Sequence, residues 1–486
     1  MFRIRAWGRR RPASLVVGVC LVISSITVGT AVATPVSDSL TGPPVRKSAS
    51  VPALVMVHGI DLATANRAVS ETGMTKLTEF RKVGIVVARA TPQQVEQARS
   101  QPGVTYVEAD QLVKLFTDNS NEVTHGAQAA RDLTGANGKP LNGSGVSVAV
   151  IDTGIDPTHP SLSGRKVVNN LVCGPLEMMG CREVGNTTLT DLAQGHGTSV
   201  SAIAVGNPIT LSDGRRISGA APGAKLVSLD AAIIVGTDRG PQADLVATNT
   251  ALSWVLENHK QPCGSGSSSK ECPPIKVTNN SYGPLHGGNF DPRSATAKLQ
   301  RALAAEGVMT VWANGNADGD GTVNESNPPG QDPTPGIVSV ASYNLTRRHV
   351  ADSSSRGLAS DPSTWPAISA PGEPILTACR PFFVDCMMAA VSMGLGPDGG
   401  NFQEVVGTSF AAPHIAGAIA QLFQLSPHAS PGDVEDALKR TAFKYDGRSV
   451  PYVRVGEYTS SFDKGTGLVD VLEAAKFLDH KNSRDH

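Results

Sequence analysis

The chain has 486 residues, enough for more than one domain, and it is rich in glycine (50) and proline (33) with only 17% charged residues. This composition is typical of a loop-rich α/β protein and excludes a coiled coil or a disordered tail. The formal net charge is −1, but residues 117–486 carry 28 basic and 36 acidic residues without any basic run. We therefore expect no nucleic-acid partner.

The first 33 residues have the pattern of a signal peptide. Five arginines between Arg3 and Arg11 form a basic segment, an apolar run follows from about Leu15 to Val28, and small residues follow at 31–33. This order is that of a secretory signal, so we expect a secreted, extracellular protein. A retained membrane anchor is the alternative, and cleavage of the signal is left open. No later segment of the sequence has the length and apolarity of a transmembrane helix.

Residues 34–116 are expected to hold a linker and a small domain. Residues 34–49 are rich in Pro, Ser and Thr, as linkers are. Short strand-like and helix-like stretches then alternate, which predicts an α+β unit, at Val51–Val57, Leu62–Thr72, Gly84–Ala88, Pro92–Ser100 and Val104–Asp110.

Residues 117–486 are expected to form an α/β domain with a parallel sheet. Five short apolar runs have the character of strands covered on both faces, at Val146–Ile151, Leu226–Leu229, Ile275–Thr278, Val308–Trp312 and Ile337–Val340. Helix-like stretches alternate with or follow them, at Ala243–Glu257, Ala295–Ala305 and Pro431–Thr441. A buried helix should begin at Ser409 and run to Phe423. We expect Pro413 in its first turn, where no intrahelical donor is lost.

Three short blocks bring an acid, an imidazole and a hydroxyl into one sequence pattern. Asp152 ends a strand-like run, His196 lies between two glycines, and Ser409 opens the apolar helix. A serine hydroxyl needs an imidazole to take its proton, and a buried carboxylate must orient that imidazole. We therefore expect Ser409 to be a nucleophile, His196 its general base, and Asp152 the residue that orients His196.

In these blocks the chain resembles the subtilisin family of serine peptidases. The order Asp, His, Ser is that family's order, and the resemblance covers about residues 50–475. It implies a subtilisin-like three-layer domain over residues 117–486 and an endopeptidase that forms an acyl-enzyme. It also implies that residues 34–116 include an inhibitor-like propeptide. Because the family junction falls near Leu115–Thr117, we expect the enzyme to cut its own propeptide after about Phe116, with Phe116 in the S1 pocket.

The resemblance also suggests residues that bind the substrate. Ala313-Asn314-Gly315-Asn316 resembles the family segment that ends Ala-Gly-Asn, which makes Asn316 the expected oxyanion donor. Asn314 stands where the family usually has Ala and is the alternative donor. Ala313, Asn314 and Gly315 should line one side of the S1 pocket. Ser281, Tyr282 and Gly283 resemble the segment that pairs with an extended substrate, with Tyr282 in place of the usual Leu.

Seven cysteines become six if the signal is removed. The six form close pairs in the sequence, Cys173 with Cys181, Cys263 with Cys272, and Cys379 with Cys386. An even count in an exported chain favours disulfides, and no Cys-x-x-Cys or Cys/His cluster favours a metal. We expect three local disulfides, although other pairings stay open.

No cofactor is expected to be required for catalysis. Family members often bind structural calcium, but this sequence assigns no ligands to it. The segment from Asn316 to Asn327 partly fits a calcium loop, yet Asn327 stands where a bidentate Glu should be. A solvated loop is the better interpretation.

Other functional classes fit the sequence less well. A lipase or esterase would need Gly-x-Ser-x-Gly with Asp and His downstream, and an acid peptidase of the sedolisin type would have Glu in place of His196. A catalytically weak or inactive binding protein is the main alternative, and it should lack one of the residues named above. We expect a monomer that acts on proteins or peptides and binds its own propeptide as an inhibitor. The natural substrate and the preferences of the S1 and S4 pockets are not predictable from the sequence.

Overall fold

The computed structural model consists of two compact units that divide between Val113 and Lys114. The expected signal peptide, the linker at 34–49 and the expected junction near Phe116 lie outside the described residues. The structure describes residues 53–81, 84–109, 120–174, 180–192, 195–233, 242–243, 245–379, 386, 398, 401–445 and 450–482.

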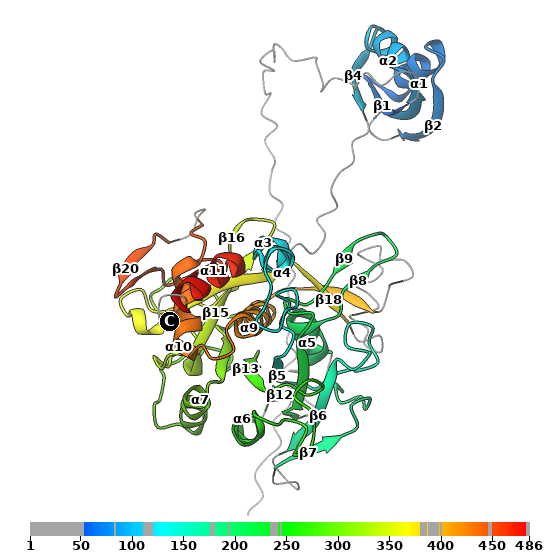
Figure 1. The fold of residues 1–486 in the computed structure, drawn as a ribbon. Coiled ribbons are helices and arrows are strands. Elements are labelled where there is room, and N and C mark those ends of the chain that lie inside the picture. The colour runs from blue at the N-terminus through cyan, green and yellow to red at the C-terminus, as the bar shows by residue number, and fades with distance from the viewer. Residues whose placement is uncertain are drawn as a thin grey trace, which may run out of the picture. The chain divides into compact units, whose positions relative to one another are not determined.

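The N-terminal unit is a four-stranded antiparallel sheet with two helices, drawn in blue in Figure 1. The strand order is β2-β3-β1-β4. Its elements are β1 (Ala53–Gly59), α1 (Leu62–Glu71), β2 (Thr75–Phe80), β3 (Ile85–Ala90), α2 (Pro92–Arg99) and β4 (Val104–Ala109). The α+β expectation is confirmed. Strand β2 was not expected, because it is an edge strand whose residues are largely exposed and so lacks the apolar alternation of a half-buried strand.

The second unit is built on a nine-stranded sheet. The strand order is β16-β15-β14-β13-β5-β10-β6-β7, and β17 pairs with β15. All neighbours are parallel except the edge strands β7 and β16. The strands are β5 (Ser147–Asp152), β6 (Val167–Gly174), β7 (Gly180–Val184), β10 (Lys225–Asp230), β13 (Ile275–Asn280), β14 (Met309–Ala313), β15 (Ile337–Asn344), β16 (His349–Val350) and β17 (Ile368–Glu373).

Helices cover this sheet on both faces, which gives the expected three layers (Figure 1). Strand β5 is buried throughout: Val148 and Val150 face the core under α5 and α9, whereas Ala149 and Ile151 face the core under α6 and α7. The helices that build these layers are α5 (His196–Val205), α6 (Leu245–Asn258), α7 (Ala295–Ala305), α9 (Thr408–Leu425), α10 (Pro431–Thr441) and α11 (Val471–Asn482). The expected α/β fold class is therefore confirmed.

Pro413 does not lie in the first turn of its helix, contrary to the expectation from the sequence. Helix α9 begins at Thr408, so Pro413 is its sixth residue and stands inside the helix. A proline there removes the hydrogen bond to the carbonyl four residues earlier, which is that of Ser409. The hydroxyl of Ser281 donates to this carbonyl instead, over 2.8 Å.

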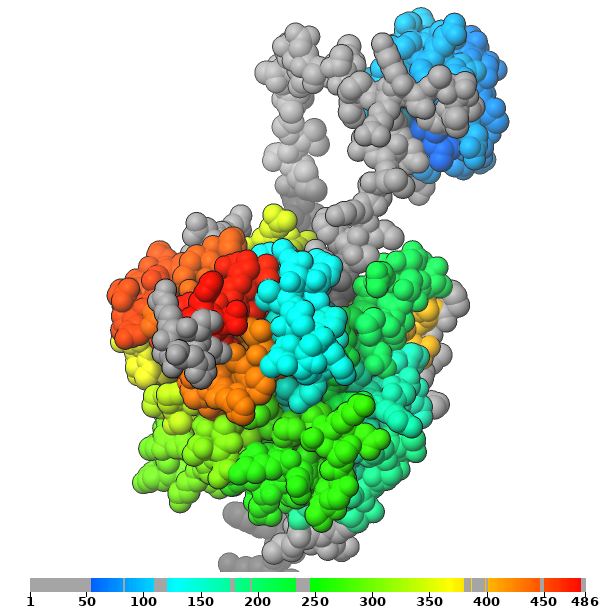
Figure 2. Space-filling model, in the orientation of Figure 1, coloured from blue at the N-terminus to red at the C-terminus, as the bar shows by residue number. Residues whose placement is uncertain are grey.

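The two ends of the second unit lie side by side. His125, next to α4 (Gly126–Asp132), is hydrogen-bonded to Asp470 at the start of α11, with 2.8 Å between Nδ1 and Oδ2. Figure 2 displays this face, with the cyan N-terminal segment of the unit against the red C-terminal helix.

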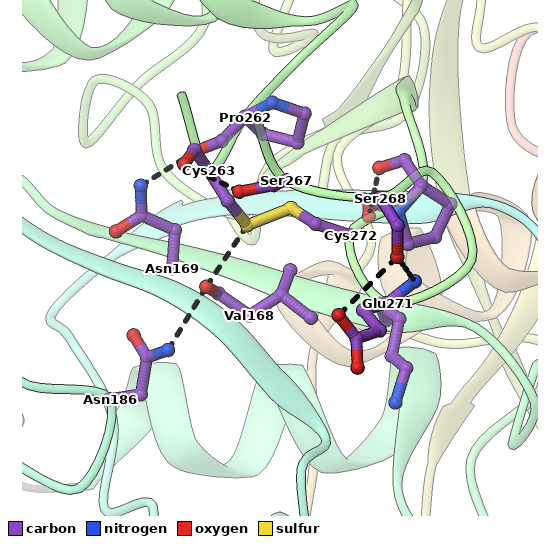
Figure 3. Close-up of a disulfide and its surroundings, with 12 residues drawn as sticks. Val168, Asn169, Asn186, Pro262, Cys263, Ser267, Ser268, Glu271 and Cys272 are labelled. Atoms are coloured by element: carbon purple, nitrogen blue, oxygen red, sulfur yellow. Dashed lines mark hydrogen bonds between the residues drawn. A yellow bond between two sulfur atoms is a disulfide. The ribbon is translucent and has the colours of Figure 1, made fainter. Parts of the chain in front are cut away.

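The three expected disulfides are present, at Cys173–Cys181, Cys263–Cys272 and Cys379–Cys386. Figure 3 shows how the second of them is attached to β6: Asn169 donates to the carbonyl of Pro262 over 2.7 Å, and the Sγ atom of Cys263 lies 3.2 Å from the carbonyl oxygen of Val168. The local pairing expected from the sequence is confirmed, and the second bridge clips a short surface loop to the sheet.

Candidate active site

Asp152 and His196 form a hydrogen-bonded pair at the carboxyl end of β5. The Nδ1 atom of His196 lies 2.7 Å from Oδ1 of Asp152, and the backbone N–H of Thr153 donates to the same oxygen over 2.8 Å. Asp152 is buried and His196 is partly exposed at the first residue of α5. In open parallel sheets, binding sites form at the carboxyl ends of the strands, at the point where the strand order reverses. Strand β5 is such a point, because β10 and β13 flank it.

Gly197 allows this pair to form. A Cβ atom at Gly197 would lie 2.2 Å from the carbonyl oxygen of Gly154, and the N–H of Gly197 donates to Thr153 over 2.8 Å. The start of α5 is therefore pressed directly against the turn that follows Asp152. A side chain at position 197 would push His196 away from its carboxylate.

A second buried carboxylate, Asp191, supports the start of α5. Its oxygens accept hydrogen bonds from the N–H of Gly195, from the N–H and hydroxyl of Thr198, and from the hydroxyl of Thr153, over 2.6–3.2 Å. Burial raises the pKa of Asp191 to about 6, although the hydrogen bonds from Thr198 oppose that shift. Asp191 was not expected from the sequence. The signal for it was an acidic residue five positions before His196.

Burial lowers the pKa of the His196 imidazole, but the charge and hydrogen bond of Asp152 raise it, and so does the charge of Asp191. The net result is a pKa above the ordinary value of 6.5. The imidazolium is therefore stabilised by the carboxylates of Asp152 and Asp191.

Ser409 is the second residue of α9 and lies beside this pair. The ring of Phe410, the next residue, stands 5.4 Å from the imidazole of His196, measured between centroids. The hydroxyl of Ser409 donates to the carbonyl of Ser281 over 3.2 Å, while the hydroxyl of Ser281 donates to the carbonyl of Ser409. Ser281 and Ser409 thus exchange hydrogen bonds, and in this conformation the Ser409 hydroxyl is directed at Ser281.

The side-chain amide of Asn316 is oriented by Thr408. The N–H and the hydroxyl of Thr408 both donate to Oδ1 of Asn316 over 2.9 Å, and the Thr408 hydroxyl accepts from the N–H of Gly315 over 3.1 Å. Both amide atoms lie close to Gly407, where a Cβ atom would stand 3.2 Å from Nδ2 and 3.3 Å from Oδ1. Because Oδ1 is occupied by Thr408, Nδ2 is the atom of this amide that can donate. An amide donor thus lies next to the start of α9.

Asn314 lies behind the wall of the site. It is fully buried, and its Nδ2 donates to Ser326 and to the carbonyl of Ser355. Its backbone N–H donates to the carbonyl of Val340 over 3.0 Å. Of the two amides left open by the sequence, Asn316 is therefore the one whose donor remains available beside Ser409.

A pocket of about 310 Å³ opens beside Ser409. Its walls include Ser281, Tyr282, Gly283, Ala313 and Gly315, all expected from the sequence, and also Leu285, Asn316, Glu325, Asn327 and Ser355. Tyr282 is anchored: its hydroxyl donates to Asn280 over 3.1 Å and its ring packs edge-on against Trp312. Burial raises the pKa of its phenol. Glu325 was not expected from the sequence.

Asp230 is a third carboxylate on the face of the sheet that carries Asp152. It ends β10 and pairs in register with Asp152 on β5. Burial raises its pKa to about 7; the N–H of Ala232 opposes that shift, and the charges of Asp191 and Asp152 add to it. The acidic end of the sheet thus disfavours a further negative charge.

His159 and His414 contact backbone groups rather than the carboxylate pair. His159 has the carbonyl of Asn401 at 2.6 Å from Nε2, and His414 has the carbonyl of Phe410 at 2.9 Å from Nδ1. Burial lowers the pKa of His414 to about 4, with backbone hydrogen bonds opposing it. Both rings hold neighbouring segments together.

In the part of the chain that the structure describes, no group of three or more His, Cys, Asp or Glu side chains could hold a metal ion. In the loop that partly fits a calcium motif, Asp320 accepts hydrogen bonds from Thr322, and Glu325 accepts one from Gly287. These oxygens are engaged with nearby protein donors.

A model of the subtilase family matches residues 143–468 of this chain, about two thirds of its length. The chain belongs to the subtilase family. The match spans Asp152, His196 and Ser409. Its relatives include a protein named a serine protease, a subtilisin, and an enzyme described as related to subtilisin. This subtilase is accordingly a serine peptidase.

Among curated proteins, the chain is 29% identical to fervidolysin of Fervidobacterium pennivorans over 385 residues, which is 74% of this chain and 45% of fervidolysin. It is 24% identical to subtilisin E of Bacillus subtilis over 408 residues, covering 84% of this chain and 85% of subtilisin E. Serine protease AprX of B. subtilis is 26% identical over 396 residues. The chain spans less than half of fervidolysin's length.

The crystal structure of fervidolysin, described as a keratinolytic enzyme related to subtilisin, shares the fold. The TM-score is 0.51 at 22% identity, and the match covers 89% of this subtilase and 62% of that chain. At this identity the likeness concerns the fold.

Proposed function

We propose that this subtilase is a secreted serine endopeptidase, made as a zymogen, that hydrolyses peptide bonds with Asp152, His196 and Ser409. The observation that carries the proposal is the Asp152–His196 hydrogen bond of 2.7 Å at the strand end beside the N-terminus of the Ser409 helix. An imidazole held this way can accept a proton from a serine hydroxyl, and the carboxylate stabilises the resulting cation.

The first step is attack by Ser409 on the carbonyl carbon of the scissile bond. The Ser409 hydroxyl turns from the carbonyl of Ser281 toward Nε2 of His196, which takes its proton. The tetrahedral oxyanion is stabilised by Nδ2 of Asn316 and by the N–H of Ser409, which belongs to the free donors at the start of α9. His196 then protonates the leaving amine, and an acyl-enzyme remains. Water, activated by His196, releases the acid.

The substrate lies extended between two walls. Backbone groups of Ser281, Tyr282 and Gly283 pair with it on one side, and Ala313 to Gly315 form the other side of the S1 pocket, with Asn314 supporting that wall from behind. Main-chain pairing tolerates many sequences, so selectivity comes from the pockets. Subtilases need no cofactor for this chemistry, and structural calcium stays unassigned here.

Residues 34–116 act as a linker and propeptide, and residues 117–486 are the catalytic domain. The propeptide is removed by the enzyme itself and inhibits it, as is typical of subtilases. The α+β fold of the N-terminal unit supports this role, and the N-terminal signal pattern supports export. No helix within the described residues is long and apolar enough to cross a membrane.

The experiment is a kinetic comparison of single alanine variants at positions 152, 196 and 409 on a peptide substrate. Each should lower kcat by roughly 10⁴ to 10⁶, the scale set by subtilisin itself. His428→Ala is the matched control, because that histidine is exposed, and it should be unaffected. Near-normal turnover by His196→Ala would refute the assignment. An inactive subtilase that only binds peptides, the alternative, would show no turnover in the wild type.

A further inference from the structure

The pocket beside Ser409 carries one acidic side chain, Glu325. Among the described residues that line it, the others are glycine, alanine, proline, leucine, serine, threonine, asparagine and the anchored Tyr282. Glu325 lies nine residues after Asn316, on the loop that returns along the pocket. Only 19% of its side chain is exposed.

The carboxylate is fixed in the pocket wall by its neighbours. Its Oε2 accepts a hydrogen bond from the N–H of Gly287 over 3.1 Å, and its own N–H donates to the carbonyl of Arg356 over 2.9 Å. A Cβ atom at Gly287 would lie 2.1 Å from the carbonyl carbon of Glu325, so the two loops are in direct backbone contact. The carboxylate is therefore tied to Gly287, which also lines the pocket.

The two walls are also tied together next to Glu325. The Nδ2 atom of Asn327 donates to the carbonyls of Tyr282 and Ala313, both over 2.9 Å, and so bridges the two sides of the pocket. A Cβ atom at Gly283 would lie 2.7 Å from Asn327, which explains the glycine there. Glu325 thus stands on a rigid frame, as a residue that selects substrates should.

The described residues give Glu325 only a weak ionic partner. His286 lies 3.7 Å away, with 84% of its side chain exposed to water, which screens such a pair. The guanidinium of Arg356 donates to the carbonyl of Gly319 instead. Glu325 thus lacks a close cationic partner among the described residues, and a cation brought by a ligand would form a charge-assisted hydrogen bond with it.

We propose that Glu325 makes Lys and Arg the preferred P1 residues of this enzyme. The inference rests on the proposed function, since it uses the same pocket and the same Ser409. The long apolar stem of a P1 Lys or Arg would lie between the two walls, along Gly283 and Gly315, while its charged end meets the carboxylate. A P1 Phe would instead cover Glu325 without pairing it, and a P1 Glu would repel it.

The test uses chromogenic peptides that share Ala-Ala-Pro and differ only at P1, as Lys, Arg, Phe or Glu. For the wild type, kcat/KM for Lys and Arg should exceed that for Phe by about tenfold or more, the factor expected of one charge-assisted hydrogen bond. In Glu325→Gln, which retains an acceptor for Gly287, this ratio should fall at least tenfold. Asp320→Asn, in the same loop but exposed, should keep the wild-type ratio.

A wild type that prefers Phe, or an unchanged ratio in Glu325→Gln, would overturn the inference while leaving an active peptidase. Failure of the proposed function would look different, because no peptide would be cleaved. In that case calorimetric binding of the product peptides ending in Lys or Phe gives the same comparison without turnover. Tighter binding of the Lys peptide that is lost in Glu325→Gln supports the inference, and equal binding contradicts it.

Discussion

The hydroxyl of Ser281 donates to the carbonyl of Ser409 over 2.8 Å, and this is the carbonyl that Pro413 leaves without its helical donor. Ser281, on the substrate wall, and Ser409, the proposed nucleophile, are therefore linked by a hydrogen bond to the backbone of Ser409 as well as by their places in the pocket. The helix can carry a proline five residues from its start because a side chain from another element completes its hydrogen bonding. That side chain is held in turn by Asn279, whose Nδ2 donates to the Ser281 hydroxyl over 2.9 Å.

The coupling predicts that Ser281→Ala lowers both stability and kcat/KM, because the Ser409 carbonyl loses its partner. An unmade hydrogen bond of a part-buried group costs about 1 to 3 kcal/mol, which corresponds to roughly 5- to 150-fold in rate if it displaces Ser409. Pro413→Ala restores a backbone N–H, so Ser281→Ala should cost less in that background. Strictly additive effects in this double-mutant cycle would contradict the coupling.

The pH profile of kcat/KM should fall on its acid side at a pKa above 6.5, because the carboxylates of Asp152 and Asp191 together outweigh burial at His196. A protonated imidazole cannot accept the Ser409 proton, so activity is lost as the pH falls through that pKa. Asp191→Asn removes one of the charges that raise it. The acid limb of this variant should move to lower pH, whereas an unmoved limb would mean that Asp191 only braces the start of α5.

Asp230 should make the folded enzyme less stable as the pH rises. Its pKa is about 7 in the fold and about 3.9 in an unfolded chain, so between these values the folded state holds a proton that the unfolded state has lost. Stability therefore falls with rising pH across this window. Asp230→Asn should be stabilised by about 2 kcal/mol more at pH 8 than at pH 5.

Thermal unfolding of the inhibitor-inactivated enzyme at the two pH values measures this difference as a shift in Tm. Asp352→Asn is the control, since the Asp352 carboxylate is exposed and pairs with Arg347 at the surface. An equal gain in stability for Asp230→Asn at pH 5 and pH 8 would show that burial does not raise the pKa of the Asp230 carboxyl group.

The proposed self-processing predicts that purified wild type begins within a few residues of Thr117 and that Ser409→Ala stays uncut. The sequence favours a cut after Phe116, whereas a Glu325 pocket favours Lys114 as the P1 residue, which would leave Leu115 at the new N-terminus. N-terminal sequencing of protein from a protease-free host reads the result. A cut Ser409→Ala would count against self-processing.

Much of the fold followed from local patterns. The runs at Val146–Ile151 and Ile275–Thr278 are strands β5 and β13, because burial on both faces gives a strand a continuous apolar sequence. Pro431–Thr441 is helix α10, because its capping residues and amphipathic pattern are visible in the sequence. Helix α11 was missed. Its residues include two lysines and several small side chains, and its packing against α4 and α10 is a tertiary relationship.

The supporting carboxylates of the site were not predicted either, because their contacts are also tertiary. Asp191 and Asp230 belong to no short motif, and Glu325 lies only in the segment that partly fits a calcium loop. The role of each depends on a residue far away in the sequence: Thr153, Asp152 and Gly287 respectively. The expectation for Pro413 was wrong because even a helix that begins at Ser409 makes Pro413 its fifth residue, beyond the first turn. In the structure Pro413 is the sixth residue, and the hydroxyl of Ser281 replaces the missing donor.

The most direct test of the central claim is covalent labelling with a fluorophosphonate, which reacts with a serine that an imidazole activates. Peptide mapping of the labelled wild type should find the adduct at Ser409 alone, with Ser409→Ala unlabelled and His196→Ala labelled at least about a thousand times more slowly. An adduct on another serine, or undiminished labelling of His196→Ala, would contradict the assignment of Asp152, His196 and Ser409 as the catalytic residues.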